Sequence, residues 1–310
     1  MLATLTHRRF SDPKWLFELK FDGERCLAFR NGSSVRLFSR NQKLLNNTYP
    51  EIGDAIAAQA LDNFVVDGEI VAFDGAVTSF SRLQRRMQIT DPIAARMTGV
   101  EVFYYVFDAP YLAGYDTTAV GLRHRKAALE RALSFEDPLR FTTHRDTEGE
   151  AAFQEACARG WEGVIAKRRD SPYVQRRSTD WLKFKCVNRQ EFVIGGFTDP
   201  HGSRVGFGAL LVGFYDGDYE DGALRYAGKV GTGYDTRTLI ELGARLRELE
   251  TPTSPFSEPV REKGAHWVRP ELVAEIGFTE WTNDGKLRHP RFLGLRDDKP
   301  ARSVVRERGI

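Results

Sequence analysis

The chain has 310 residues, of which 41% are hydrophobic and 28% are charged, as is ordinary for a globular protein. This length is enough for about two domains, each with its own core. The formal net charge is only +2, so no positive field over the whole molecule indicates a polyanionic partner, and a nucleic-acid site would have to be a local patch.

The cysteine content and the hydropathy pattern restrict the class of protein further. Cys26, Cys157 and Cys186 are odd in number, lie far apart and show no CxxC spacing. This argues against a zinc site and a disulfide framework, and it favours a reducing compartment. The N-terminus has no apolar signal region, and no run of about 18 apolar residues predicts a membrane span. We therefore expect a cytoplasmic protein.

The first pattern in chain order is an alternation of apolar and polar residues from Trp15 to Phe21. Period two places the aromatic residues on one face of a strand and Glu18, Lys20 and Asp22 on the other. A strand would therefore present Lys20 between two carboxylates. Taken alone, a lysine in this position is more often a solubilising surface group than a catalyst.

Elements of both kinds follow through the first part of the chain. Strand-like runs cover Phe64 to Phe73, Val102 to Phe107, Gly163 to Lys167 and Trp181 to Cys186, and helical patterns cover Leu122 to Leu133 and Glu150 to Ala158. This mixture predicts an α+β domain over residues 1–188.

The pattern changes after Asn188. Short strands separated by Gly, Asp and Pro turns are expected at Phe192 to Phe197, Ala209 to Tyr215 and Leu224 to Val230, with one helix at Thr236 to Leu249. We interpret residues 189–310 as a small, partly open β-barrel of the OB-fold kind, a fold that often binds nucleic acid.

Carboxylates interrupt two of the apolar strands. Asp67 and Glu69 lie within the run from Val65 to Val71, and Glu162 stands at the entry to the strand that begins at Gly163. Burying a carboxylate costs several kcal/mol unless it is paired or bound to a metal. Glu69 is therefore a functional candidate, although a hairpin turn would also accommodate it.

Two lysines share one face of the run from Trp181 to Cys186. Period two places Leu182 and Phe184 on one face and Lys183 and Lys185 on the other. Two such ammonium groups repel each other unless an anion lies between them, and a phosphate would satisfy this geometry. The alternative is a solvated strand face. Several cations in one cleft would also lower the pKa of a nucleophilic lysine among them.

Two further side chains are candidates for binding a nucleotide. Arg40 follows the strand from Val35 to Phe38, where a guanidinium could bind a phosphate. Phe107 closes another apolar strand, where its ring could stack on a base. In isolation, each is more often an ordinary surface or core residue.

These segments together resemble the motifs of a known enzyme family. The run from Lys20 to Arg25 is similar to the KxDGxR motif of ATP-dependent DNA ligases and mRNA capping enzymes. Further motifs of that catalytic domain follow in order at Ser39-Arg40-Asn41, Asp67-Gly68-Glu69, Phe107-Asp108, Glu162 to Lys167 and Trp181 to Lys185. The stretch from Arg288 to Lys299 resembles the closing motif of the second domain, in the form found in the ligase domain of bacterial ligase D and its stand-alone relatives.

The resemblance implies a fold and an activity. The expected fold is an adenylation domain, of the nucleotidyltransferase and ATP-grasp-like type with mixed antiparallel sheets, followed by an OB-fold β-barrel domain. The expected activity is that of an ATP-dependent DNA ligase (EC 6.5.1.1), which seals 5′-phosphate and 3′-hydroxyl ends in repair or end joining. Lys20 would attack the α-phosphate of ATP and become a lysyl-adenylate, and the AMP would then pass to the DNA.

The resemblance also implies roles for the other site residues. The adenine would be read by Glu18 and the backbone of Leu19 and stacked on Phe107. Arg25 and Glu69 would bind the ribose and the neighbouring phosphate, and Arg40 would steer a phosphate. Lys183 and Lys185 would neutralise the α-phosphate, and Arg296 and Lys299 would orient the pyrophosphate. Glu162 and Glu69 would bind Mg²⁺ (or Mn²⁺).

Alternatives and partners remain open from the sequence. RNA ligation and GTP-dependent capping share the first motif, and a DNA-binding module without catalysis is an alternative of another class. The expected partners of a monomeric ligase are nicked or broken duplex DNA and either a Ku-like end-binding protein or a separate repair polymerase.

Overall fold

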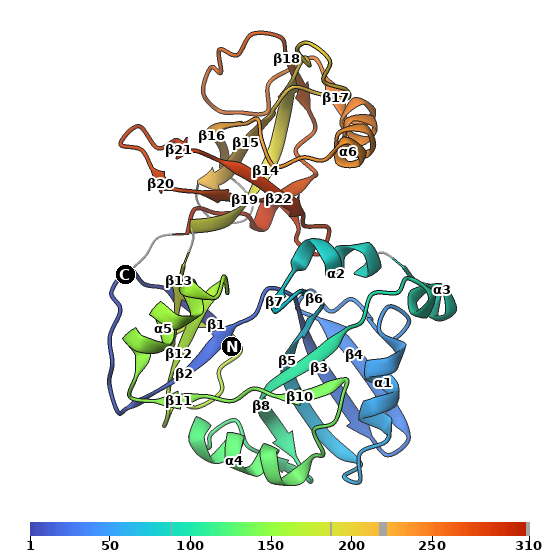
Figure 1. The fold of residues 1–310 in the computed structure, drawn as a ribbon, viewed down its shortest axis with the longest axis vertical. Coiled ribbons are helices and arrows are strands. Elements are labelled where there is room, and N and C mark those ends of the chain that lie inside the picture. Colours follow the sequence, from blue (N-terminus) through green and yellow to red (C-terminus); the bar gives the residue numbers. More distant parts are fainter. Residues whose placement is uncertain (88, 187, 217–221, 308–310) are drawn as a thin grey trace. The chain divides into compact units, whose positions relative to one another are not determined.

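The computed structural model describes residues 1–87, 89–186, 188–216 and 222–307 (Figure 1). The chain folds into two compact units, of which the first ends at Cys186 and the second comprises the described residues that follow. Each unit has its own apolar core. Among the described residues, no helix is long and apolar enough to cross a bilayer.

One five-stranded sheet of the first unit carries most of the predicted site. In order across the sheet, its strands are β1 (Leu2–Leu5), β13 (Arg177–Lys185), β12 (Gly163–Arg168), β2 (Trp15–Lys20) and β11 (Arg145–Asp146). β1 runs parallel to β13, and the other neighbours are antiparallel. The helix α5 (Gly149–Ala158) packs against β12 and β2.

A six-stranded sheet forms the other part of this unit. Its strands are β10 (Leu139–Phe141), β8 (Phe103–Leu112), β5 (Asn63–Val71), β3 (Glu24–Asn31) and β4 (Ser34–Ser39), with β9 (Tyr115–Asp116) paired to β8. A two-stranded sheet adds β6 (Phe73–Asp74) and β7 (Val77–Thr78). Because β10 runs parallel to β8 and the other pairs are antiparallel, the prediction of mixed sheets is confirmed.

The helices of the first unit were predicted only in part. The two helical patterns are confirmed by α4 (Leu122–Ala132) and α5. The sequence did not reveal α1 (Pro50–Ala57), α2 (Phe80–Met87) and α3 (Pro92–Met97). These three helices have only six to eight residues, too few for a period of 3.6 to stand out.

The second unit is built on an antiparallel sheet. Its strands are β16 (Ala223–Val230), β15 (Leu210–Asp216), β14 (Asn188–Thr198), β18 (Ala265–Val268) and β17 (Glu250–Thr251), with β19 (Val273–Phe278) between β14 and β22 (Arg291–Leu295). The shorter elements are the pair β20 (Glu280–Trp281) and β21 (Leu287–Arg288), the helix α6 (Thr236–Glu248) and a 3₁₀ turn at Ala301–Ser303. The predicted strands and helix are present.

The sheet of the second unit stays open over the residues that the structure describes, in agreement with the expected partly open barrel. Within the described residues, no ladder joins β16 to β22. The long strand β14 pairs with β19 through its first six residues, 188–193, and with β18 through 196–198, near a bulge at Ile194/Gly196. The sheet therefore turns at β14, its outer strands β16 and β22 do not pair among the described residues, and the domain is OB-like.

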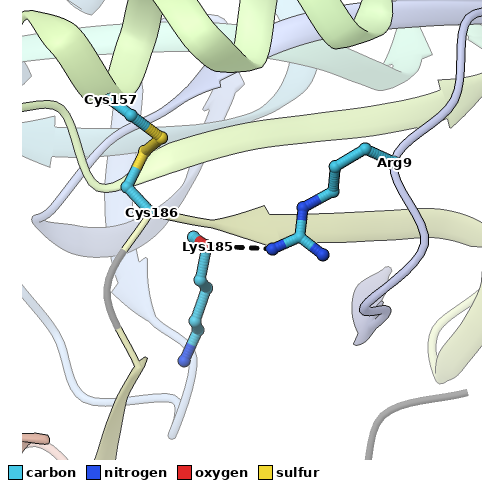
Figure 2. The surroundings of a disulfide bond; sticks show 4 residues. All are labelled: Arg9, Cys157, Lys185 and Cys186. Atoms are coloured by element: carbon cyan, nitrogen blue, oxygen red, sulfur yellow. Dashed lines mark hydrogen bonds between the residues drawn. A yellow bond between two sulfur atoms is a disulfide. The ribbon is translucent and has the colours of Figure 1, made fainter. Parts of the chain in front are cut away.

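The expectation against a disulfide was wrong. Cys157 and Cys186 form a disulfide bond, and Cys26 is a buried free cysteine (Figure 2). The two bonded cysteines are 29 residues apart in the sequence, but α5 packs on β12, and β13 pairs with β12. Packing on the same strand brings their Cα atoms to 5.3 Å, a proximity that spacing along the chain cannot reveal.

Candidate active site

Three neighbouring strands align the predicted lysines. Lys20 on β2 lies opposite Gly163 on β12, which lies opposite Lys185 on β13. Glu18 and Lys183 occupy the next row, on either side of a single β12 residue. Residues directly opposite each other on neighbouring strands point to the same face. The structure therefore confirms that these side chains share a face, including the predicted alternation of β13.

Two glycines of the motifs are required by close approach of the backbone. A Cβ atom on Gly163 would lie 1.9 Å from the Phe184 carbonyl oxygen, and this glycine has a φ of +151°. A Cβ atom on Gly23 would lie 2.2 Å from the carbonyl oxygen of Ile70. Gly163 also leaves the space between Lys20 and Lys185 without an intervening side chain, so a phosphate could lie there.

Lys20 is held by a carboxylate. Its Nζ lies 2.5 Å from Oε2 of Glu162, and the two side chains are 22% and 5% exposed. Burial alone would lower the pKa of Lys20, but the charge and hydrogen bond of Glu162, with smaller contributions from Asp22 and Glu69, raise it. The prediction that the pKa of Lys20 is lowered was therefore wrong, because the carboxylates around Lys20 outweigh the effect of burial.

Glu18 lies between two lysines that were not predicted as site residues. Its Oε1 is 2.7 Å from Nζ of Lys126 on α4, and its Oε2 is 2.5 Å from Nζ of Lys167 on β12. All three side chains are at most 2% exposed. Burial raises the pKa of the Glu18 carboxyl, but the two lysines outweigh burial and hold this pKa below its usual value. Burial lowers the pKa of Lys167 to about 8.

Only one of these two lysines had a signal in the sequence. Period two along β12 places Lys167 on the same face as Gly163, and hence on the face of Lys20. Lys126 lies on a helix, and no local pattern connects it with β2. Only the packing of α4 brings it to Glu18.

The ring of Phe107, which was predicted to stack on adenine, borders this buried cluster. Lys167 Nζ lies 4.2 Å from the centre of the Phe107 ring and 4.1 Å from that of Trp181. The guanidinium of Arg25 lies 4.8 Å from the same Phe107 ring. Phe107 therefore belongs to the surroundings of Glu18, and cations contact its ring.

Arg25 is part of a buried clamp. Its Nε and Nη2 donate to the two carboxylate oxygens of Asp67, which is fully buried. The hydroxyl of Tyr173 donates to Asp67 Oδ2 over 2.7 Å. This fork fixes Arg25 against β5, so Asp67 acts as a support for the site that the sequence had not identified.

The carboxylates near Lys20 suit a cation that is shared with a nucleotide. Glu162 contacts the Lys20 ammonium group directly, and the charges of Asp22 and Glu69 also raise the pKa of Lys20. Within the described residues, no group of three or more His, Cys, Asp or Glu could form a cage around a metal. Mg²⁺ is commonly held by one or two carboxylates together with phosphate and water. Glu162 and Glu69 fit that pattern.

Two further predicted residues of the first unit adjoin the residues described above: Leu19 lies between Glu18 and Lys20 on β2, and Arg40 lines the same groove as Arg25. Arg40 is exposed and lines an open groove of about 880 Å³ together with Arg25, Tyr173 and Phe38. Leu19 is 37% exposed, and its backbone pairs with that of Val164 on β12. The phosphate-steering role of Arg40 and the adenine-reading role of Leu19 stay predictions.

The two predicted residues of the second unit have carboxylate partners. Arg296 Nε lies 2.9 Å from Asp298 Oδ1, and Lys299 Nζ lies 3.0 Å from Glu191 Oε2. Burial would lower the pKa of Arg296, but Asp298, Glu275 and Glu191 raise it. Their action on pyrophosphate stays a prediction.

Both units match models of known families. Residues 1–185 match a family described as "ATP dependent DNA ligase domain", and residues 203–299 match "ATP dependent DNA ligase C terminal region". A solved structure named "mycobacterial DNA ligase D complexed with ATP and MES" superposes with a TM-score of 0.68 at 36% identity, covering 99% of this chain and 98% of that one.

Curated relatives extend the match to longer proteins. The multifunctional non-homologous end joining protein LigD of Pseudomonas aeruginosa is 41% identical over 301 residues, which is 95% of this chain and 35% of that protein. LigD of Mycobacterium tuberculosis is 40% identical over 317 residues, 99% of this chain and 39% of that protein. The chain thus spans little more than a third of these relatives.

Proposed function

The chain belongs to the family of ATP-dependent DNA ligases, and from this we propose that it joins 5′-phosphate and 3′-hydroxyl ends of duplex DNA through AMP carried on Lys20. The observation that carries the proposal is the shared face of β2, β12 and β13. There Lys20 contacts Glu162, and Lys183 and Lys185 point to the same side. A nucleophile, a carboxylate and two cations are thus grouped on one sheet.

The first step is the transfer of AMP from ATP to Lys20. The Nζ atom attacks the α-phosphorus, and pyrophosphate leaves. Lys183 and Lys185 neutralise the charge that builds up on the α-phosphate, and Glu18 and Phe107 orient the base. Glu162 and Glu69 would hold Mg²⁺, which supplies further neutralisation of phosphate charge when bound.

Proton loss from Lys20 precedes this attack. The ammonium has no lone pair for the new bond, and its raised pKa keeps it protonated near neutral pH. Asp67 supports the site indirectly, because it fixes Arg25 beside Phe107.

In the later steps, AMP moves to the 5′-phosphate of a break and is then displaced by the 3′-hydroxyl. Arg296 and Lys299 of the second unit would orient pyrophosphate in the first step. The same unit would bind duplex DNA afterwards, so it must act in two arrangements. Its C-terminal stretch supplies the positive charge for phosphate contacts, at Arg288, Arg291, Arg302 and Arg306.

Adenylation with radiolabelled nucleotide tests the proposal directly. The full chain is incubated with Mg²⁺ and either α-labelled ATP or α-labelled GTP, and the protein is then separated under denaturing conditions. We expect a covalent AMP adduct with ATP, and joining of a nicked duplex after nicked DNA is added. A GTP adduct alone would support capping. The absence of any adduct would refute the enzyme proposal and favour a DNA-binding module.

The choice of DNA over RNA rests on the two family descriptions, which both name ATP-dependent DNA ligases. A parallel assay with nicked duplex DNA, nicked duplex RNA and a mixed strand separates these substrates. We expect DNA nicks to be joined fastest.

We also propose a cellular setting. The names of the LigD relatives refer to end joining, so we propose that this chain acts as a monomer on broken duplex DNA in the bacterial cytoplasm. Its partner would be a Ku-like end-binding protein or a separate repair polymerase. Joining of blunt double-strand ends should rise when a purified Ku-like protein is added, and unchanged joining would contradict that partnership.

A further inference from the structure

The disulfide between Cys157 and Cys186 lies beside the proposed site. Cys186 directly follows Lys185, and its N–H donates to the carbonyl oxygen of Glu162 over 3.0 Å. The bond is thus one residue from a proposed phosphate-binding lysine and one backbone hydrogen bond from the carboxylate that contacts Lys20. Its other end lies on α5, which packs behind the sheet.

A second contact joins the same two segments without a covalent bond. Nη2 of Arg9 donates to the Lys185 carbonyl oxygen over 3.3 Å, as Figure 2 shows. The Arg9 guanidinium also lies 4.7 Å from the ring centre of Phe153 on α5. These contacts, with the buried Phe184 and Ala156 in one core cluster, keep α5 beside β13 when the disulfide is open. The two sulfur atoms therefore stay close enough to re-form the bond.

The accessibility of the three cysteines distinguishes the bonded pair from the remaining one. Cys157 and Cys186 are half-buried, so a small thiol can reach them. Cys26 is fully buried, and burial raises the pKa of its thiol well above the usual value. Since the thiolate is the reactive form, Cys26 does not compete in thiol–disulfide exchange.

We propose that Cys157 and Cys186 form a redox-sensitive restraint that positions Lys185 and Glu162 for adenylation of Lys20. This inference rests on the proposed function. With the bond closed, the end of β13 is tied to α5, and Lys185 is held beside the α-phosphate site. With the bond open, the covalent link from β13 to α5 is lost while the Arg9 contacts, the core packing and the pairing with β12 remain. The end of β13 then moves more, and AMP transfer slows because its alignment is looser.

A low-molecular-weight disulfide is the oxidant that forms the Cys157–Cys186 bond. One cysteine thiolate attacks a sulfur of the small disulfide, which releases one small thiolate and leaves a mixed disulfide. The second cysteine thiolate attacks the protein sulfur of that mixed disulfide and releases the second small thiolate. The two released thiolates take up the two protons of the cysteines. The protein is oxidised by two electrons, and the small disulfide is reduced to two thiols.

The test measures thiol state and adenylation rate in parallel on the full chain. The protein is equilibrated in glutathione buffers of graded oxidised-to-reduced ratio, and free thiols are counted by alkylation and mass spectrometry. The rate of AMP transfer to Lys20 is measured with labelled ATP and Mg²⁺. We expect the reduced protein to react about threefold to tenfold more slowly than the oxidised one. The midpoint of the change in rate should fall at the same glutathione ratio as the midpoint of the change in the number of free thiols.

Two variants serve as controls. The double variant Cys157→Ser, Cys186→Ser retains neither thiol, so it should adenylate at the rate of the reduced wild type in every buffer. Cys157→Ser cannot form the bond either and should adenylate at that rate in reducing buffers. Circular dichroism checks that both are folded. The proposal is overturned if oxidised glutathione forms no Cys157–Cys186 bond, if both redox forms of the wild type react equally fast, if the oxidised form is slower, or if a variant responds as the wild type does.

Hydrogen exchange separates this inference from the proposed function. Opening the bond should speed exchange at the Cys186 amide, which donates to Glu162. If no adenylate forms in any redox state but this amide responds, the ligase proposal fails and the restraint remains. If adenylate forms but neither the rate nor the exchange depends on the thiol state, the restraint is overturned and the ligase proposal remains.

Discussion

The two faces of the sheet formed by β2, β12 and β13 differ sharply. On one face, Phe17, Val164 and Phe184 are at most 2% exposed and belong to the core cluster that includes residues of α5. The other face carries Lys20 and the charged residues around it. The same strands thus provide stability on one side and chemistry on the other, because successive residues of a strand point to opposite faces. Substitutions one position apart should have different effects.

The largest expected effect is a loss of activity on the charged face. Lys20→Arg keeps a positive charge opposite Glu162 but removes the amine that accepts AMP. We expect adenylation to fall by more than about 1000-fold, with little change in thermal stability. Labelled ATP and differential scanning calorimetry measure the two effects.

The matched control for Lys20→Arg is Lys14→Arg, which changes an exposed lysine just before β2. Lys14→Arg should leave the adenylation rate and the thermal stability unchanged. A labelled adduct on Lys20→Arg would mean that another residue is the nucleophile.

On the apolar face, the largest effect should be on stability. Phe184 is fully buried against Phe10, Phe17 and Phe153. Phe184→Ala should lower the unfolding free energy of the first unit by about 3–5 kcal/mol, because it leaves a cavity. Adenylation per folded molecule should change far less than in Lys20→Arg.

Urea unfolding followed by circular dichroism measures this loss. As a control, Phe207→Ala removes a fully buried ring from the second unit and should shift the unfolding of that unit instead. An unchanged transition in Phe184→Ala would contradict the division of roles between the two faces.

Glu18 lies on the charged face but is buried, so it should combine both effects. Glu18→Gln would leave Lys126 and Lys167 buried without their carboxylate partner. Removing one partner of a buried ion pair typically lowers the free energy of unfolding by about 3 kcal/mol. We expect a loss of this size in the unfolding free energy together with weaker ATP binding, measured by urea unfolding and by isothermal titration.

A half-exposed glutamate provides the control for Glu18→Gln. Glu155 on α5 pairs with Arg145 and Arg159 at the surface, so Glu155→Gln should cost less than about 1 kcal/mol. Equal losses in the two variants would show that burial does not decide the contribution of these charges.

The smallest expected effect is a pH dependence of the stability of the second unit. The hydrogen bond to Asp199, and further contacts with Glu250, raise the pKa of His266 above its usual 6.5. The folded state thus binds this proton more tightly than the unfolded state. The resulting stabilisation is fully present below pH 6.5 and is lost as the pH rises through the raised pKa.

Because His266 is partly exposed, this contribution should stay below about 1 kcal/mol. Unfolding of the second unit between pH 6 and pH 8 should show the dependence, and His266→Gln should reduce it. His201→Gln, which alters an exposed histidine, should not change the dependence. A pH dependence that survives in His266→Gln would assign it to another group.

Much of the fold and of the candidate site could be predicted from local patterns. The alternation of apolar and polar residues placed Lys20 on the polar face of β2, and Lys183 and Lys185 on the polar face of β13. This was possible because period two is a property of a single strand. The ordered motifs indicated the family and its two-part fold. The helices α4 and α6 were found because they are long enough for a helical period to be recognised.

Only the tertiary structure decided which distant residues meet. It paired Glu18 with Lys126 and Lys167 and joined Cys157 to Cys186. It also left the sheet of the second unit without a closing ladder among the described residues. It also reversed the expected shift in the pKa of Lys20, because that shift depends on which charge lies nearest in space. The sequence by itself determined the chemistry available on each strand face, since that follows from local geometry. The partners of those groups were decided by packing between segments that are far apart in the chain.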